Sequence, residues 1–201
     1  WSSDVCSSDL WERKSFTGVE VNGKVLGIIG MGRIGTEVAK RMIAMGMTIL
    51  AFDPFLTEEK AGKIGVRLVT LDELLAEADF ITIHTPLTKE TNGIINAETL
   101  RQVKKGVRII NCARGGIVDE EALAAAITEG RVAGAALDVF VTEPPSNRSL
   151  IDLPEVVVTP HLGASTAEAQ VNVAVDVARE ISKVLKDEPF KNAVNIPSVR
   201  P

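Results

Sequence analysis

A glycine-rich run, GIIGMGRIG, limits the fold of this chain more than any other stretch. It places the pattern G-x-G-x-x-G between an apolar run, Val25–Ile29, and a helical pattern over residues 33–45. In that setting Gly30 permits a tight turn, Gly32 lets the backbone approach a pyrophosphate, and Gly35 lets the helix pack closely on the strand. The start of the helix then directs unpaired N–H groups at the phosphates. The run therefore predicts a strand, loop and helix that bind a dinucleotide, and an ordinary turn is the alternative.

A carboxylate at the end of the next apolar run indicates which dinucleotide the chain binds. Asp53 follows Thr48–Phe52 and lies 18 residues beyond Gly35. An acid in that place accepts hydrogen bonds from the adenosine ribose hydroxyls and repels a 2′-phosphate. The sequence therefore predicts NAD rather than NADP as the cofactor. The alternative is a solvated acid at a strand end, before Pro54.

Short apolar runs alternate with helical patterns along the rest of the chain. The expected strands are 25–29, 48–52, 80–84, 107–111, 132–137 and 156–159, and the expected helices are 33–45, 57–63, 70–78, 97–103, 119–129 and 166–186. Thr70 and Glu73 carry the signature of a capping box, and Asn96 is the expected cap of the helix that follows it. Strands that are apolar throughout indicate a sheet buried on both faces. We therefore predict an α/β fold with a doubly wound parallel sheet of Rossmann type.

The bulk composition excludes several classes of protein. Hydrophobic residues make up 45 % of the chain and charged residues 24 %, as is ordinary for a globular protein. No apolar run approaches the ~20 residues that a membrane helix needs. The net charge of −5, with no basic cluster, argues against a nucleic-acid partner. No spacing of His, Cys and Asp predicts a metal site.

The first ten residues, WSSDVCSSDL, resemble a common sequencing adapter translated in frame rather than protein. A short linker rich in Ser and Asp, or a processed leader, is the alternative. On the adapter interpretation Cys112 is the one cysteine left, which fits a reducing cytosol and predicts a cytoplasmic protein. We expect the dinucleotide-binding domain to span residues 11–164 and the start of a linker to occupy residues 191–201.

Ligands in a sheet of this kind bind at the carboxyl ends of its strands. Seven polar residues fall at or just beyond such ends: Asp53, His84, Thr85, Asn111, Arg114, Asp138 and His161. They span more than 100 positions of sequence, and the predicted sheet would bring them to one rim. We interpret His84 as a neighbour of the cofactor or a packing residue, and Cys112 as a small packing residue beside the cofactor. Asp138 could orient the nicotinamide ribose or carboxamide, or bond to the backbone.

Three residues near this rim suit the oxidation of a hydroxy acid. The His161 imidazole can give and take a proton near neutrality, and a carboxylate such as Glu143 would favour its protonated form. Arg114 offers a planar fork for a substrate carboxylate, and the two glycines after it would let the backbone come close to a ligand. Each has a plainer alternative: a structural histidine, a solvated loop acid, and an arginine that caps carbonyls or pairs with an acid.

The motifs of the chain together resemble those of the D-isomer-specific 2-hydroxyacid dehydrogenases. The resemblance covers residues 11–197, and its motifs lie at 27–35, 53, 84–88, 111–120, 133–140, 143–145 and 160–166. It implies a catalytic set of Arg114, Glu143 and His161, in which the histidine moves the proton, the glutamate supports it and the arginine binds the substrate. The cofactor contacts expected from the glycine loop, the strand ends and the resemblance together are Gly30, Gly32, Arg33, Ile34, Gly35, Asp53, His84, Thr85, Pro86, Cys112, Ala113, Arg114, Asp138, His161, Gly163 and Ala164.

The implied reaction is the oxidation of 3-phospho-D-glycerate to 3-phosphooxypyruvate by NAD, the entry step of serine synthesis. Members of the family pair through the NAD-binding domain, which implies a homodimer. Their substrate domain comes mainly from upstream sequence and is completed by a C-terminal helix, here within residues 165–190. That upstream part is missing here, so we expect this fragment to bind NAD but to turn over poorly.

Three alternatives stay open, one of which is a truncated dinucleotide-binding module used for dimerisation. The chain could come from another enzyme of the same family, such as a glyoxylate/hydroxypyruvate reductase or a D-lactate-type dehydrogenase. It could also come from a non-catalytic NAD-sensing protein of the corepressor type, which shares these motifs. Substrate choice depends largely on the upstream part, so the motifs do not separate the enzymes.

Overall fold

The computed structural model describes residues 17–190, which fall into two compact units divided after Val158. The strands of the first unit are β1 (Val25–Ile29), β2 (Thr48–Phe52), β3 (Arg67–Leu68), β4 (Phe80–Ile83), β5 (Val107–Asn111), β6 (Val132–Leu137) and β7 (Val156–Val158). Its helices are α1 (Arg33–Ala44), α2 (Glu58–Ile64), α3 (Leu71–Glu77), α4 (Thr99–Gln102), α5 (Glu120–Thr128) and α6 (Arg148–Ile151). The predictions made for residues 1–10 and 191–201 lie outside the described residues.

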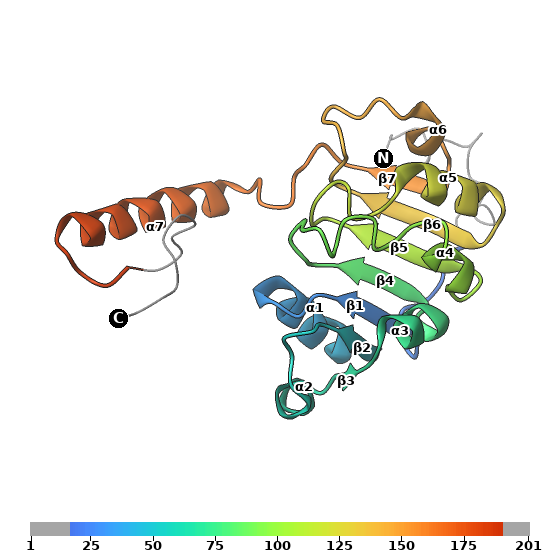
Figure 1. Ribbon diagram of the computed structural model, residues 1–201, viewed down its shortest axis with the longest axis horizontal. Helices are drawn as coiled ribbons and strands as arrows, with labels where there is room; N and C mark the ends of the chain where they lie inside the picture. The colour runs from blue at the N-terminus through green and yellow to red at the C-terminus, as the bar shows by residue number, and fades with distance from the viewer. Residues whose placement is uncertain (1–16, 191–201) are drawn as a thin grey trace, which may run out of the picture. The chain divides into compact units, whose positions relative to one another are not determined.

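The strands form one parallel sheet in the order β3-β2-β1-β4-β5-β6-β7 (Figure 1). Strand β1 pairs with β2 on one side and with β4 on the other, so the direction of winding reverses between β1 and β4. This confirms the predicted Rossmann-type α/β sheet. Such a reversal leaves a crevice at the carboxyl ends of the two central strands, where ligands bind in folds of this class.

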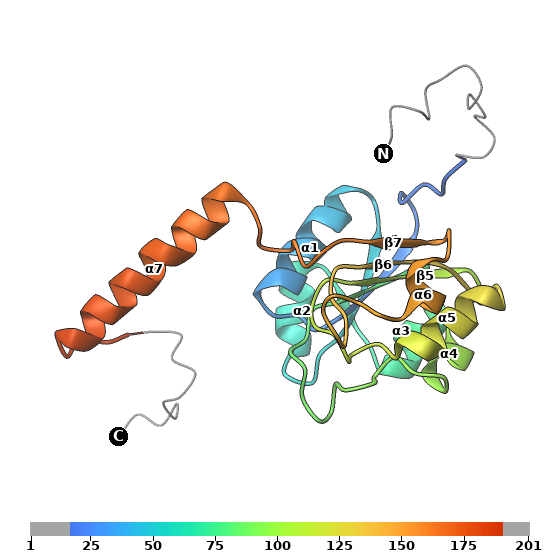
Figure 2. The ribbon, with the colours of Figure 1, turned by 90° about the horizontal axis from the view of Figure 1, so that it is seen from above.

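Each face of the sheet has its own hydrophobic core. On one face Ile81 and Ile109 pack in a cluster with Leu74 of α3 and Leu123 of α5, and Figure 2 shows α3 to α6 gathered on that side of strands β5–β7. On the other face residues of β1 and β2 pack with α1 and α2, as with Ala39. At β1 and β2, burial on both sides explains why the strand residues are mostly apolar instead of alternating, whereas Val157 and Val158 of β7 are exposed.

Local signals in the sequence place several helix ends. The predicted capping box is present, since Thr70 Oγ1 accepts a hydrogen bond from Glu73 N (3.3 Å) and Glu73 Oε2 accepts one from Thr70 N (2.8 Å). Helix α2 begins after Thr57, whose hydroxyl accepts from Lys60 N. It ends at Gly65, which adopts a left-handed conformation with φ of 85°.

The structure differs from the sequence prediction in its shortest elements. Strand β3 has two residues and helix α6 has four, and neither was predicted because so few residues show no periodicity. Helix α4 is shorter than the predicted 97–103. Asn96 does cap this turn, since its Oδ1 accepts from Glu98 N (2.8 Å) and Thr99 N (3.2 Å), but the regular helix begins only after these bonds.

The second unit contains the long helix α7 (Ala167–Leu185), which matches the predicted helix within one residue at each end. Thr166 caps it, with Oγ1 accepting from Ala169 N at 3.1 Å. Among the helices of residues 17–190, none has both the length and the apolar character to span a membrane. The domain boundaries at 11–164, 165–190 and 191–201 stay predictions.

Candidate active site

The glycine loop joins β1 to α1 and is built so that side chains are excluded at two positions. Gly30 has φ of 94°, and a Cβ there would lie 2.7 Å from Thr85 Cγ2 and 2.8 Å from the carbonyl oxygen of His84. A Cβ on Gly35 would overlap the carbonyl oxygen of Gly30. The first glycine therefore allows the turn, and the last one allows α1 to approach the loop.

The start of α1 can receive an anion. Gly32 is its N-cap residue, so no side chain caps the helix, and nothing lies within 4 Å of the place where a Cβ would stand. The first N–H groups of a helix lack partners within the helix, and its dipole favours negative charge at this end. Open space beside such a terminus suits a pyrophosphate group.

Asp53 lies directly after β2 and is half-buried. Its Oδ2 accepts a hydrogen bond from Met31 N at 2.7 Å, and its Oδ1 accepts one from Phe55 N at 2.8 Å. The plainer alternative, a solvated acid, is therefore incomplete, because both oxygens are bound to backbone. A carboxylate oxygen can accept more than one hydrogen bond, so each retains capacity for a ribose hydroxyl.

A cavity of about 410 Å³ lies between the glycine loop and the ends of β2 and β4. Its walls are mainly apolar, with Phe52, Phe55, Pro86 and Ile94 among the lining residues. The Oγ1 of Thr85, also in the lining, is a buried side-chain oxygen without a hydrogen-bond partner within residues 17–190. An apolar slot with a few polar groups fits an adenosine moiety, and an unsatisfied hydroxyl fits a polar ligand atom. The residues present therefore fit the cofactor that the glycine loop predicts.

His84 is half-buried at the end of β4, with Nε2 3.1 Å from Thr82 Oγ1. Burial lowers the pKa of its imidazole below the ordinary value of 6.5, because desolvation disfavours the charged ring. His84 is therefore neutral near neutrality, as a cofactor neighbour or packing residue would be.

This lowered pKa predicts a pH dependence of stability. The unfolded chain protonates His84 at a higher pH than the folded chain does, so stability should fall as pH drops below about 6.5. We expect the free energy of unfolding in urea to decrease less between pH 7.5 and pH 5.5 in His84→Gln than in the wild type. An imidazole pKa of 6.5 or above, measured by NMR in the folded chain, would contradict this.

Arg114 is exposed on the loop after β5, and its Nη1 donates to the carbonyl oxygen of Ala113 at 2.6 Å. The buried side chain of Asn111 holds this loop, since Oδ1 accepts from Ala113 N and Nδ2 donates to the carbonyl oxygen of Arg114, both at 3.0 Å. Asn111 was counted among the rim residues but was given no role. An Asn at a strand end, two to three residues before a turn, is the signal for such a bond.

The loops after β5 and β6 contact each other closely. A Cβ on Gly115 would overlap the carbonyl oxygen of Phe140. The sequence predicted that the glycines after Arg114 let the backbone come close to a ligand, but Gly115 lies against the backbone of the neighbouring loop instead. Val141 N donates to Glu120 Oε1 at 2.8 Å, and Phe140 N donates to Glu143 Oε1 at 3.2 Å. The two loops that carry Arg114 and Glu143 are therefore held together.

A second, more open hollow of about 700 Å³ borders these two loops. Gly116, Glu120 and Thr142 are among its lining residues. It is the larger of the two hollows, but it lacks the glycine loop and Asp53. We therefore assign the cofactor to the smaller cavity, where those groups lie.

Asp138 and Cys112 differ in their surroundings. Asp138 is buried, and its backbone N–H donates to the carbonyl oxygen of Asn111 at 3.0 Å. Cys112 is exposed, and its interpretation as a small packing residue beside the cofactor stays a prediction. Partial burial, and to a smaller extent the charge of Asp138, raise the pKa of the Cys112 thiol. The thiol therefore lacks the lowered pKa of a nucleophile.

The first unit carries most of the predicted site at one edge of its sheet. The parallel strands β1, β2, β4, β5 and β6 end at this edge (Figure 1), and they are followed by the glycine loop, Asp53, His84 with Thr85, the Arg114 loop and Asp138 with Glu143. Within residues 17–190, no three side chains of His, Cys, Asp or Glu gather to hold a metal ion.

The other predicted site residues, His161, Gly163 and Ala164, belong to the second unit. His161 has φ of 54°, in the left-handed region. A residue other than glycine pays about 1–3 kcal/mol to stay there, and such residues concentrate at functional sites. The strain is consistent with a functional histidine.

Comparisons with known proteins agree with this geometry. The family model for the D-isomer specific 2-hydroxyacid dehydrogenase, NAD binding domain, matches residues 2–163. The chain belongs to the D-isomer specific 2-hydroxyacid dehydrogenases. D-3-phosphoglycerate dehydrogenase of Bacillus subtilis is 58 % identical over 189 residues, which are 94 % of this chain and 36 % of the relative. The chain thus spans about a third of the length of the curated relatives it matches.

Solved structures of the family have the same fold. A glyoxylate reductase from Paecilomyes thermophila superposes with a TM-score of 0.87 at 35 % identity, covering 95 % of this chain and 58 % of that one. A D-lactate dehydrogenase with NAD+ from Lactobacillus jensenii gives a TM-score of 0.81 at 30 % identity, covering 90 % and 58 %. The first unit is therefore the NAD-binding domain of a 2-hydroxyacid dehydrogenase, with NAD as the cofactor.

Proposed function

We propose that this chain is the NAD-binding part of an enzyme that oxidises 3-phospho-D-glycerate to 3-phosphooxypyruvate. The observation that carries this proposal is the 58 % identity to a D-3-phosphoglycerate dehydrogenase, in a chain whose Arg114 loop ends at the same sheet edge as the glycine loop. A loop fixed by Asn111 can present the guanidinium of Arg114 to a substrate in a defined direction.

Each of the three catalytic-type residues has a defined task in this proposal. Arg114 binds the substrate carboxylate through the paired N–H groups of its guanidinium. A ring nitrogen of His161 removes the proton of the substrate 2-hydroxyl, and the carboxylate of Glu143 favours the imidazolium that forms. NAD, when bound, accepts the hydride that leaves C2. The proton and hydride together account for the two hydrogens lost by the alcohol.

A comparison of substrates on the full-length protein tests this function. We expect kcat/KM for NAD reduction to be at least ~10²-fold higher with 3-phospho-D-glycerate than with D-lactate or D-glycerate, since a site that pairs a phosphate rejects analogues lacking it. A preference for D-lactate, or for glyoxylate in the reverse direction, would instead assign the chain to the reductases that its fold also resembles. NAD binding without turnover of any 2-hydroxy acid would support a sensor.

We also propose a homodimer formed through the NAD-binding domain, and a cytoplasmic location. The dimer is supported by membership of the family, and the location by the use of cysteine, since Cys112 is a free thiol. Sedimentation of the full-length protein at several concentrations measures the assembly, and a monomer at all of them would contradict the dimer.

A further inference from the structure

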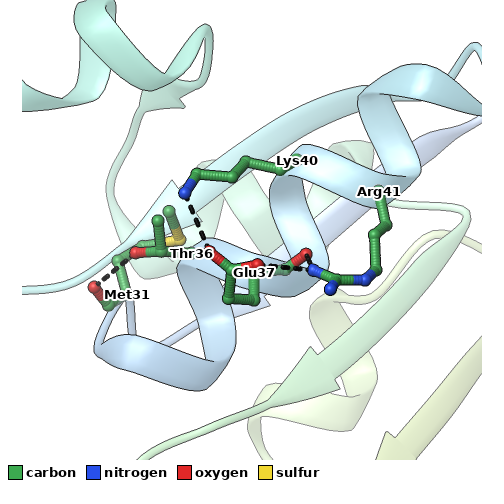
Figure 3. A network of polar contacts seen from close by, with 5 residues as sticks. All are labelled: Met31, Thr36, Glu37, Lys40 and Arg41. Carbon is green, nitrogen blue, oxygen red and sulfur yellow. Dashed lines mark hydrogen bonds and ion pairs between the residues drawn. The ribbon is translucent and has the colours of Figure 1, made fainter.

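Met31, in the middle of the glycine loop, is held at both of its peptide groups. Its N–H donates to Asp53 Oδ2 at 2.7 Å. Its carbonyl oxygen accepts from Thr36 Oγ1 at 3.2 Å, as Figure 3 shows. Its side chain is 7 % exposed and packs in the core beneath α1. The carbonyl oxygen of Gly32 accepts from Thr36 N at 3.0 Å. The backbone that leads into α1 is therefore fixed from several directions.

The same carboxylate also reaches the wall of the cavity. Asp53 Oδ1 accepts from Phe55 N at 2.8 Å, and Phe55, which lines the cavity, is 90 % exposed. In addition, Gly30 N donates to the carbonyl oxygen of Phe52 at 2.9 Å. One side chain, that of Asp53, thus joins the loop that faces the phosphates to the segment that lines the adenosine side.

We propose that Asp53 is a positioning residue that sets the glycine loop for the pyrophosphate before the cofactor arrives, in addition to any contact with the ribose. This inference rests on the proposed cofactor site. The bonds to Met31 and Phe55 join the Asp53 carboxylate to backbone N–H groups of the protein itself, so neither bond requires an atom of the ribose. A loop already held in its binding conformation loses less conformational freedom when the ligand binds, and affinity rises accordingly.

The sign of an electrostatic effect separates this role from simple ribose recognition. A carboxylate near a bound phosphate repels it, so removal of Asp53 by itself should tighten the binding of any anion. Loss of the positioning bonds has the opposite effect. Glu37 is the acid of α1, and its negative charge is compensated by ion pairs with Lys40 (2.8 Å) and Arg41 (2.6 Å), as Figure 3 shows. The hydrogen bond to Lys40 contributes most to lowering the pKa of Glu37 to about 2.

Binding of ADP and of 2′,3′-dideoxy-ADP to the full chain tests the proposal by calorimetry. In Asp53→Ala we expect dideoxy-ADP to bind about tenfold more weakly than in the wild type, although this ligand has no ribose hydroxyls to lose. Asp72 is an exposed acid in the first turn of α3, so Asp72→Ala is the matched control. It should leave the affinity for both ligands unchanged. Dideoxy-ADP that binds Asp53→Ala as well as the wild type, or better, would overturn the positioning role.

A second variant removes a bond to the loop without touching the carboxylate. Thr36→Val keeps the side-chain volume but loses the hydroxyl bond to Met31 O. We expect it to weaken ADP and dideoxy-ADP equally, by about threefold, because the ribose contact is intact. An unchanged affinity for both ligands would count against the loop being held through Met31.

Hydrogen exchange measures the same bonds with no ligand present. We expect the Met31 amide to exchange at least tenfold faster in Asp53→Ala than in the wild type, while the amides of Leu26 and Ile28 in β1 keep their rates and report an intact fold. An equally slow Met31 amide in both proteins would refute the bond to Asp53. Failure of phosphoglycerate turnover would leave these ligand-free results unchanged, so the two proposals are tested separately.

Discussion

Replacement of Arg114 or His161 by alanine in the full-length protein is expected to lower kcat by ~10²-fold or more, with NAD affinity within a few fold of the wild type. Arg114 is exposed, and its guanidinium bonds to the adjacent carbonyl of Ala113, so its removal creates no cavity in the core. The loss should therefore appear in turnover and not in folding. Steady-state kinetics with 3-phospho-D-glycerate, together with calorimetric NAD binding, measure both quantities.

Conservative variants separate charge from geometry at these two positions. Arg114→Lys keeps the positive charge but loses the planar fork, so we expect it to recover only part of the lost kcat/KM. His161→Gln keeps a polar group that cannot carry a proton at neutral pH and should be as inactive as His161→Ala. Unchanged turnover in either alanine variant would remove that residue from the mechanism.

The fold was predictable where elements are long enough to show a pattern. Strands β1, β2, β5 and β6 begin and end where the predicted runs do, because most of their residues are apolar and buried, although β5 also contains Arg108. The capping box at Thr70 fixed one helix start for a local reason, a pair of reciprocal hydrogen bonds. The two-residue strand β3 exists only because it pairs with β2, a contact that its own residues do not encode.

The candidate site was predictable as a set of positions but not as a set of contacts. Polar residues after parallel strands had to lie at one edge, which the topology of the first unit confirms for Asp53, His84 and Arg114. The two hydrogen bonds that the Asp53 carboxylate accepts from Met31 N and Phe55 N could not be foreseen, because they depend on how two loops meet in space. The same holds for Gly115, whose neighbour Phe140 is 25 residues away in the sequence.

Gly115→Ala is expected to destabilise the chain by ~1–3 kcal/mol, because the added methyl group would overlap the carbonyl oxygen of Phe140 and drive the two loops apart. The effect is steric, since Gly115 is not among the glycines with positive φ. The free energy of unfolding in urea, followed by circular dichroism, measures it. Equal stability of Gly115→Ala and the wild type would show that the loops can separate at little cost.

Gly62→Ala provides the matched control, because it makes the same chemical change in a different environment. Gly62 lies within helix α2, and nothing stands within 4 Å of the place that its Cβ would take. Alanine restricts the unfolded chain and favours the helix, so this variant should be more stable by ~0.5–1 kcal/mol. If the free energy of unfolding falls in Gly115→Ala but rises in Gly62→Ala, the loss of stability at Gly115 is due to the contact between the loops. In the full-length protein, Gly115→Ala should then also lower kcat for the proposed reaction, since Arg114 and Glu143 lie on the two loops that it separates.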